Sequence, residues 1–178
     1  MSGPEITLTA CPADIVELIA FRDRAAGIER VAADSSLPLP ALGASAARGD
    51  RFALSVRPGR WLILSPPAAP GRAAAHWQER CAGLGAAVDL SGGLNAFLLT
   101  GPAVREMLIR GCRLDLAAGA FPAGSAAATI MVQVAVTLAA VEGGMLLLTP
   151  ATTARHLREW LIETSRPFGL QCSGDRWI

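Results

Sequence analysis

The sequence predicts an α+β fold in which two β-α-β-β-α units form one compact domain of 178 residues. Three observations predict it: a five-residue phrase that occurs twice, a glycine turn ahead of each copy, and a helical segment behind each copy. Residues 62–66 are Leu-Ile-Leu-Ser-Pro, and residues 146–150 are Leu-Leu-Leu-Thr-Pro. At this fixed spacing, residues 52–85 align with residues 136–169 without a gap. The pattern favours an internal duplication, although strand–turn–strand–helix is common enough for a match by coincidence.

The first half is expected at residues 12–85. Its expected elements are, in order, a strand over 15–21, a helix over 24–33, a loop over 35–50, strands over 52–56 and 61–64, and a helix over 73–84. Residues 35–50 are rich in Pro, Ala, Gly and Ser, which favours a loop. Gly59 can supply the positive φ of a tight turn, Pro66 stops the returning strand, and Gly85 stands where a helix would end.

The second half is expected at residues 86–169, with a short tail at 170–178. Its expected elements are a joining strand over 86–90, a strand over 94–100, a short helix near 104–108, strands on both sides of Gly143, and a helix over 153–168. Pro102 suits a first helical turn. In the last helix, Leu157, Trp160 and Leu161 recur at helical spacing, and Thr152 or Thr153 can cap its start.

Residues 116–141 carry no charge and are long enough to span a bilayer. They contain Gly119, Pro122, Gly124 and other polar or helix-breaking residues, and they become rich in β-branched residues from Thr129. A loop followed by a buried strand therefore fits better than a membrane helix, and we expect no membrane association.

Composition excludes several functions. The formal net charge of +1 argues against a nucleic-acid partner. All sixteen positive residues are arginines, so lysine-dependent chemistry such as Schiff-base formation is excluded. No two cysteines have a metal-ligand spacing, so we expect no metal site; they are Cys11, Cys81, Cys112 and Cys172. No secretory signal is visible at the N-terminus, and a cytoplasmic location with reduced cysteines is expected.

No catalytic constellation is visible. His76 and His156 both fall on expected helices, and no acidic residue is spaced to orient either of them. Ser91-Gly92-Gly93 follows a strand and could approach a phosphate, but a strand rather than a helix comes next, which favours a hairpin turn. Asp89 and Ser91 are the candidate ligand-binding residues, because Asp89 ends a strand beside this turn. Asp115, between two leucines, is interpreted as a cap.

Two further groups have structural interpretations. Trp61, Trp77 and Trp160 are expected to pack helices against a sheet. Arg105, Arg110 and Arg113 could meet an anion or an acidic partner, but a solvated face is the favoured interpretation.

Residues 88–124 resemble a known family. The segment begins with Val88-Asp89-Leu90-Ser91, continues with Leu99-Thr100-Gly101-Pro102 and Arg110-Gly111-Cys112, and ends with Leu114-Asp115-Leu116 and Phe121-Pro122-Ala123-Gly124. This succession resembles the gamma subunit of heterotetrameric bacterial sarcosine oxidases, and the similarity extends from about Ile15 to Gly169. Gly92-Gly93 and Ala117 depart from the family, which often has aspartate and arginine at the first place and histidine at the second.

The resemblance implies a fold similar to the folate-binding domain of glycine-cleavage aminomethyltransferases. It implies an enzyme that oxidises sarcosine with oxygen, giving glycine, hydrogen peroxide and a one-carbon unit passed to tetrahydrofolate. FAD, FMN and NAD would belong to the larger subunits and zinc to the smallest. The gamma chain would be an accessory subunit without a cofactor or catalytic residues of its own.

Two hypotheses follow. As an accessory subunit, the chain should expose an apolar surface to the larger flavoprotein subunits, with Phe121, Pro122, Trp177 and Ile178 as candidate contacts, and could pair with a second copy when isolated. As a stand-alone binder of folate or another small molecule, it should have a pocket near Asp89 and the turn that contains Ser91.

Overall fold

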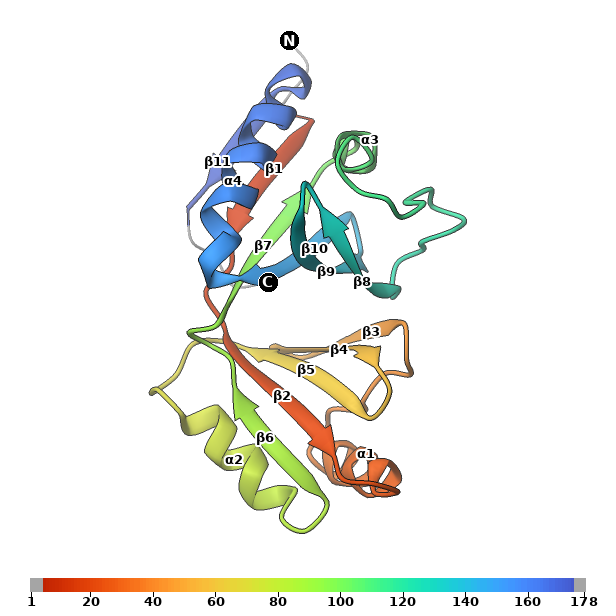
Figure 1. Ribbon diagram of the computed structural model, residues 1–178, viewed down its shortest axis with the longest axis vertical. Coiled ribbons are helices and arrows are strands. Elements are labelled where there is room, and N and C mark those ends of the chain that lie inside the picture. The colour runs from red at the N-terminus through yellow and green to blue at the C-terminus, as the bar shows by residue number, and fades with distance from the viewer. Residues whose placement is uncertain (1–4, 175–178) are drawn as a thin grey trace. The chain divides into compact units, whose positions relative to one another are not determined.

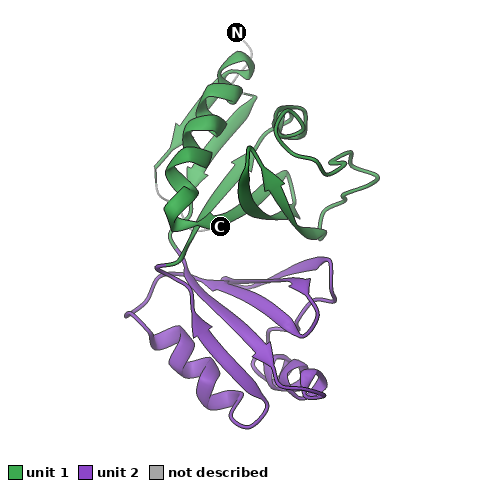
Figure 2. Ribbon diagram, in the orientation of Figure 1, with its two compact units in different colours: residues 1–12, 93–178 green, residues 13–92 purple. Residues whose placement is uncertain are grey.

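The computed structural model describes residues 5–174 (Figure 1). It confirms the predicted α+β class, with two mainly antiparallel sheets and helices packed against them. The expected contacts Trp177 and Ile178 lie outside the described residues. Contacts along the chain define two compact units: unit 1 comprises residues 1–12 and 93–178, and unit 2 comprises residues 13–92 (Figure 2).

Unit 2 is a five-stranded antiparallel sheet with the strand order β3-β4-β5-β2-β6. Its elements are β2 (Asp14–Ala20), α1 (Ala25–Asp34), β3 (Ala44–Arg48), β4 (Arg51–Arg57), β5 (Arg60–Ser65), α2 (Arg72–Arg80) and β6 (Gly85–Asp89). Because side chains alternate along a strand, Val16 and Trp61 lie on one sheet face and pack with the helices in one core. Helix α1 contributes Ile28 and α2 contributes Trp77.

Unit 1 is a six-stranded sheet with the strand order β11-β1-β7-β10-β9-β8. Its elements are β1 (Ile6–Ala10), β7 (Leu94–Thr100), α3 (Val104–Leu108), β8 (Ala126–Met131), β9 (Val134–Val141), β10 (Gly144–Pro150), α4 (Ala151–Ser165), the 3-10 turn η1 (Arg166–Phe168) and β11 (Leu170–Ser173). Strand β11 is parallel to β1, and the other pairs are antiparallel. Leu157 and Leu161 of α4 pack into the core with Phe97 of β7.

The repeated phrases occupy matching places in the two sheets. Each lies in a central strand, β5 or β10, which pairs with the strand before it and with β2 or β7. Gly59 and Gly143 turn the chain between these strands with φ of 63° and 70°, so the predicted positive φ is confirmed at both turns. The shared strand order supports a common unit, and the duplication itself stays a prediction.

Three strands were not expected. Residues 35–50 were expected to be loop, but β3 pairs there with β4. Strand β1 was not expected, and the tail supplies β11, which pairs with β1. Strand β3 is made of small and polar residues, which have weak strand propensity, and it forms through its hairpin with β4. Strands β1 and β11 form through pairing with segments distant in sequence. Unit 2 extends to Gly92 because β6 pairs along β2. The repeat boundary between residues 85 and 86 stays a prediction.

The uncharged stretch 116–141 contains a loop, as predicted, but the single buried strand expected after it is a hairpin of two strands, β8 and β9. Among residues 5–174, no helix combines the length and apolar character needed to cross a lipid bilayer.

Candidate functional site

Asp89 and Ser91 bind each other and the start of β2. The Ser91 backbone N–H donates to Asp89 Oδ1 at 2.9 Å, and the Ile15 N–H donates to Ser91 Oγ at 3.0 Å. Asp89 is exposed, and hydrogen bonds from the hydroxyl and then the amide of Ser91 hold the pKa of this carboxyl below its ordinary value. The amide of Gly71 acts in the same direction. This ionised carboxylate suits hydrogen-bond acceptance better than proton transfer at neutral pH.

A second carboxylate, that of Asp14, binds the loop that contains Gly71, and the sequence did not reveal it. Asp14 Oδ2 accepts a hydrogen bond from the N–H of Ala68 at 3.1 Å, in the segment that connects β5 to α2. Asp14 begins β2, one strand away from the Asp89 end of β6. The two aspartates therefore position residues 66–71. The contacts of the predicted ligand residues Asp89 and Ser91 stabilise a turn and hold this loop in place.

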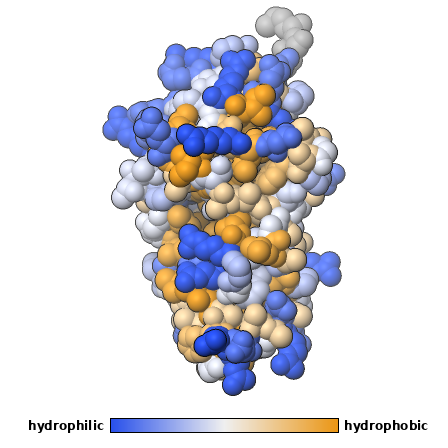
Figure 3. All heavy atoms as spheres, turned by 45° about the vertical axis from the view of Figure 1, so that its right-hand side comes forward, coloured by the Kyte–Doolittle hydropathy of each residue, from blue (hydrophilic) through white to orange (hydrophobic). Residues whose placement is uncertain are grey.

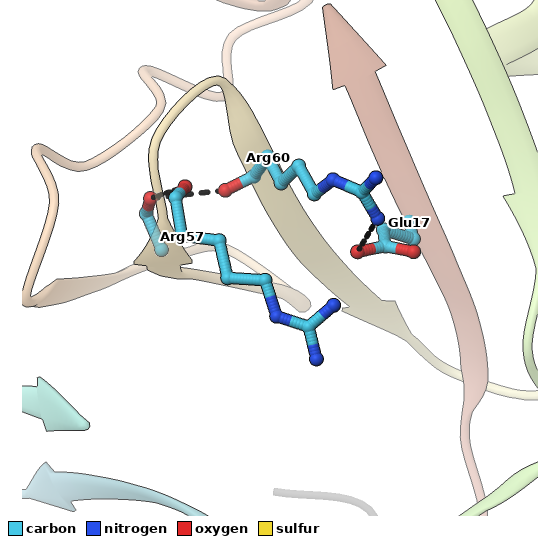
Figure 4. Close-up of polar contacts among 4 residues, drawn as sticks. Glu17, Arg57 and Arg60 are labelled. Atoms are coloured by element: carbon cyan, nitrogen blue, oxygen red, sulfur yellow. Dashed lines mark hydrogen bonds and ion pairs between the residues drawn. The ribbon is translucent and has the colours of Figure 1, made fainter. Parts of the chain in front are cut away.

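A polar group lies on the face of the unit 2 sheet that α1 and α2 do not cover (Figure 4). Arg60 Nη1 is 3.4 Å from Glu17 Oε1, and the Glu17 side chain is 17% exposed. Ser55 Oγ donates to the carbonyls of Arg57 and Arg60 and closes the β4–β5 turn. Arg57 extends nearby, with no carboxylate partner among the described residues (Figure 4). This group offers charge and hydrogen bonds, and its one hydroxyl, that of Ser55, is engaged by the carbonyls of the turn.

Arg105 organises the long loop of unit 1. Its Nη1 donates to the carbonyl of Leu116 and, at 2.9 Å, to the carbonyl of Phe121. Asp115 Oδ1 accepts from the N–H of Ala117 at 2.9 Å, which confirms the predicted capping role of Asp115. Because a guanidinium has several fixed donors, one half-buried arginine ties α3 to two points of the loop. The contact with Arg105 involves residues 11 and 16 positions away, so no local pattern signals it.

Phe121 was expected to be an exposed contact for a partner, and its burial contradicts that expectation. Its side chain is 8% exposed and belongs to the core of unit 1 with Leu116 and Val134. The physical reason is the favourable burial of the apolar ring in this core, while the Arg105 bond to the Phe121 carbonyl holds the loop against the sheet. Pro122, the next residue, is exposed and remains a candidate contact.

A pocket of about 490 Å³ lies in unit 1 beside the β9–β10 turn. Its lining includes Gly101, Pro102, Arg105, Ala123, Glu142 and Gly143. A Cβ on Gly101 would collide with the backbone of Glu5, so this glycine is required by the fold. The pocket brings one cation and one carboxylate together, and its volume lies within the range of small-molecule sites.

The other candidate side chains lie apart from these sites. His76 and His156 are exposed on helices of different units, as the favoured interpretation predicted. Arg110 lies over the ring of Phe168, 4.6 Å from its centroid, and is 3.9 Å from Glu106. Among residues 5–174, no cluster of His, Cys, Asp and Glu has an arrangement that could hold a metal ion.

The three tryptophans pack as predicted: Trp61 and Trp77 are buried in the core of unit 2, and Trp160 packs against that of unit 1. The Trp61 Nε1–H also donates to the carbonyl of Pro40 at 3.0 Å, so it fixes the segment before β3.

These features define a protein of the aminomethyltransferase-like fold. A chain of the heterotetrameric sarcosine oxidase from Corynebacterium sp. U-96 has a TM-score of 0.82 and 22% identity to this chain, with 95% of this chain and 88% of that chain covered. The glycine cleavage system aminomethyltransferase T from Bartonella henselae has a TM-score of 0.69 at 14% identity. That match covers 96% of this chain, which spans about half (48%) of the aminomethyltransferase.

The sequence profile of the sarcosine oxidase gamma subunit family matches residues 23–166. The chain belongs to that family, so the recognised resemblance is confirmed. No curated protein sequence matches this chain.

Proposed function

We propose that this chain is an accessory subunit, without a catalytic role of its own, of a heterotetrameric flavoprotein sarcosine oxidase. The observation that carries the proposal is the family match over residues 23–166. The fold shared with a chain of a heterotetrameric sarcosine oxidase supports it. In this proposal, the complex oxidises sarcosine to glycine with oxygen, releases hydrogen peroxide and passes the one-carbon unit to tetrahydrofolate.

We assign the cofactors of this reaction to the other subunits: FAD, FMN and NAD to the larger ones and zinc to the smallest. The residues of this chain support that assignment. Ser91-Gly92-Gly93 joins strand β6 to strand β7, whereas a dinucleotide-binding glycine loop opens a helix. Asp89, which could have been a ligand or a base, binds backbone amides of its own unit. The expected cytoplasmic location and self-pairing of the isolated chain remain predictions.

The test is to express the remaining subunits of the oxidase of the same organism with and without this chain. We expect assembly and sarcosine-dependent peroxide release only when the chain is present, and no turnover by the chain alone. Asp89→Asn should leave turnover by the assembled complex unchanged, because Asp89 has a local structural role. Turnover by the isolated chain, or full assembly without it, would contradict the accessory role.

The pocket beside the β9–β10 turn favours a second candidate function, a binder of folate or another small molecule. The pocket lies beside Arg105 and Glu142 rather than beside Asp89, where such a site had been expected. Titration of the isolated chain with a reduced folate, followed by tryptophan fluorescence, tests this candidate. A saturable change that Arg105→Gln weakens would support it. No change at millimolar folate would exclude a binding free energy more favourable than roughly −4 kcal/mol.

A further inference from the structure

We propose that the free edge of β8 accepts an extended strand from one of the larger subunits of the complex, an inference that rests on the proposed function. Strand β8 is the last strand of the unit 1 sheet and pairs with β9 on one side. Ala128 and Ile130 are exposed, and Ile130 has 49% of its surface accessible. Hydrophobic patches among polar side chains are visible on the face in Figure 3.

The register shows which backbone groups of β8 point outward. Met131 and Val134 flank a two-residue turn, so they form a hydrogen-bonded pair. Hydrogen-bonded and non-hydrogen-bonded pairs alternate along an antiparallel ladder. Ala126, Ala128 and Ile130 therefore direct their N–H and C=O groups away from β9. In the described residues, the Thr129 hydroxyl reaches the Ile130 carbonyl at 3.5 Å, and the bridge between Cys112 and Met131 adjoins Ile130. The open part of the edge is therefore centred on Ala126 and Ala128, at which no backbone bond to the outer side is found within residues 5–174.

The other edge strands have the protections that β-proteins use against pairing. Strand β3 has Arg48 at its end, followed by Gly49 and Asp50. On β6, Gln78 Oε1 of α2 accepts from the N–H of Ala87 at 2.9 Å. Strand β11 is only four residues long. Strand β8 has six residues with neither a charge nor a proline, so its edge is suited to pairing with another chain.

The segment that follows α3 limits what can pair with this edge. Cys112 forms an isolated bridge with Met131, and the Val132 N–H donates to the Gly111 carbonyl at 3.2 Å. A second copy of this chain paired about Ala128 would carry its own Ser125 to the place where residues 111–112 lie. The edge is therefore assigned to a different chain, which adds a strand that ends before Met131. Backbone hydrogen bonds supply the contact, as in other strand-addition complexes.

The test compares two Ala→Pro variants at outward-facing edge positions. Ala128→Pro removes one outward N–H of β8 without removing a bond to β9. Ala47→Pro is the matched control: Ala47 is exposed and faces outward on β3, by the same alternation from the Arg48–Arg51 pair. Each purified variant is titrated against the remaining subunits of the oxidase of the same organism. We expect at least a tenfold increase in the dissociation constant for Ala128→Pro and less than a twofold change for the control.

Thermal unfolding of both variants checks their folding. If Ala128→Pro does not fold, Ala128→Lys places a charge at the same exposed position and should weaken binding in the same way. If the unsubstituted chain binds and neither Ala128 variant binds more weakly, the edge inference is wrong while the proposed function stands. If the unsubstituted chain binds no subunit, the proposed function fails and this inference fails with it. A homodimer of the isolated chain that Ala128→Pro dissociates would also overturn the assignment.

Discussion

Replacing Phe121 with alanine should destabilise the chain strongly. The side chain is 8% exposed and lies in the core of unit 1, where α3, the following loop and the sheet meet. Removing a buried phenylalanine ring costs about 3–5 kcal/mol, through lost transfer free energy and the cavity left behind. The Arg105 bond to the Phe121 backbone persists in the variant, so the loop cannot easily close over the cavity.

The assay is urea unfolding of the isolated chain, and the matched control is Pro122→Ala. Pro122 is the exposed neighbour, and its replacement should change the free energy of unfolding by no more than about 1 kcal/mol, through the conformational entropy of the unfolded chain. A loss of less than about 1 kcal/mol for Phe121→Ala, where core truncations cost several, would refute the burial argument. It would restore Phe121 as a candidate partner contact.

Three further predictions follow from single positions. Gln133 has a φ of 69°, so Gln133→Gly should raise the free energy of unfolding in urea by about 1 kcal/mol. Gly143 has a φ of 70° and open space where a Cβ would lie, so Gly143→Ala should lower the same free energy by a similar amount. Changes of the same sign in both variants would contradict the strain argument. A thiol reagent should modify Cys172 first, because it is exposed, whereas Cys81 is buried and its burial raises the pKa of its thiol more than neighbouring Arg80 lowers it. Fast labelling that persists in Cys172→Ser would refute this prediction. The hydrogen bonds that lower the pKa of Asp89 stabilise the fold at pH values above the ordinary aspartate pKa, and this stabilisation is lost as the pH falls through the lower pKa of the folded state. Asp89→Asn should therefore reduce the loss of stability on the acid side of a plot of unfolding free energy against pH. An unchanged plot would count against the turn contacts.

Much of the fold was predictable because its strongest elements have local signals. The strands around Gly59 and Gly143 combine apolar runs with a turn glycine, and α4 has helical periodicity in Leu157 and Leu161. Strands β1 and β11 had no such signal, because β1 pairs with β7 some ninety residues away and β11 exists through β1.

The candidate site was predictable only where its contacts are short in sequence. The Asp89–Ser91 turn joins residues two positions apart, so the sequence indicated the pair. The Asp14 bond to Ala68 and the Arg105 bonds join residues farther apart, so the sequence did not indicate them. Phe121 followed by Pro122 has the pattern of an exposed loop. Its burial depends on an arginine sixteen residues earlier, and a sequence pattern cannot show that contact.

The proposed role is tested most directly by purifying this chain, tagged, from its own cells and recording the masses of the bound proteins together with the visible spectrum. We expect the chain to elute with larger subunits that show flavin absorption, in a complex with one copy of this chain. A colourless chain, alone or paired with itself, would contradict the assignment as an oxidase subunit and would direct attention to the pocket beside Arg105.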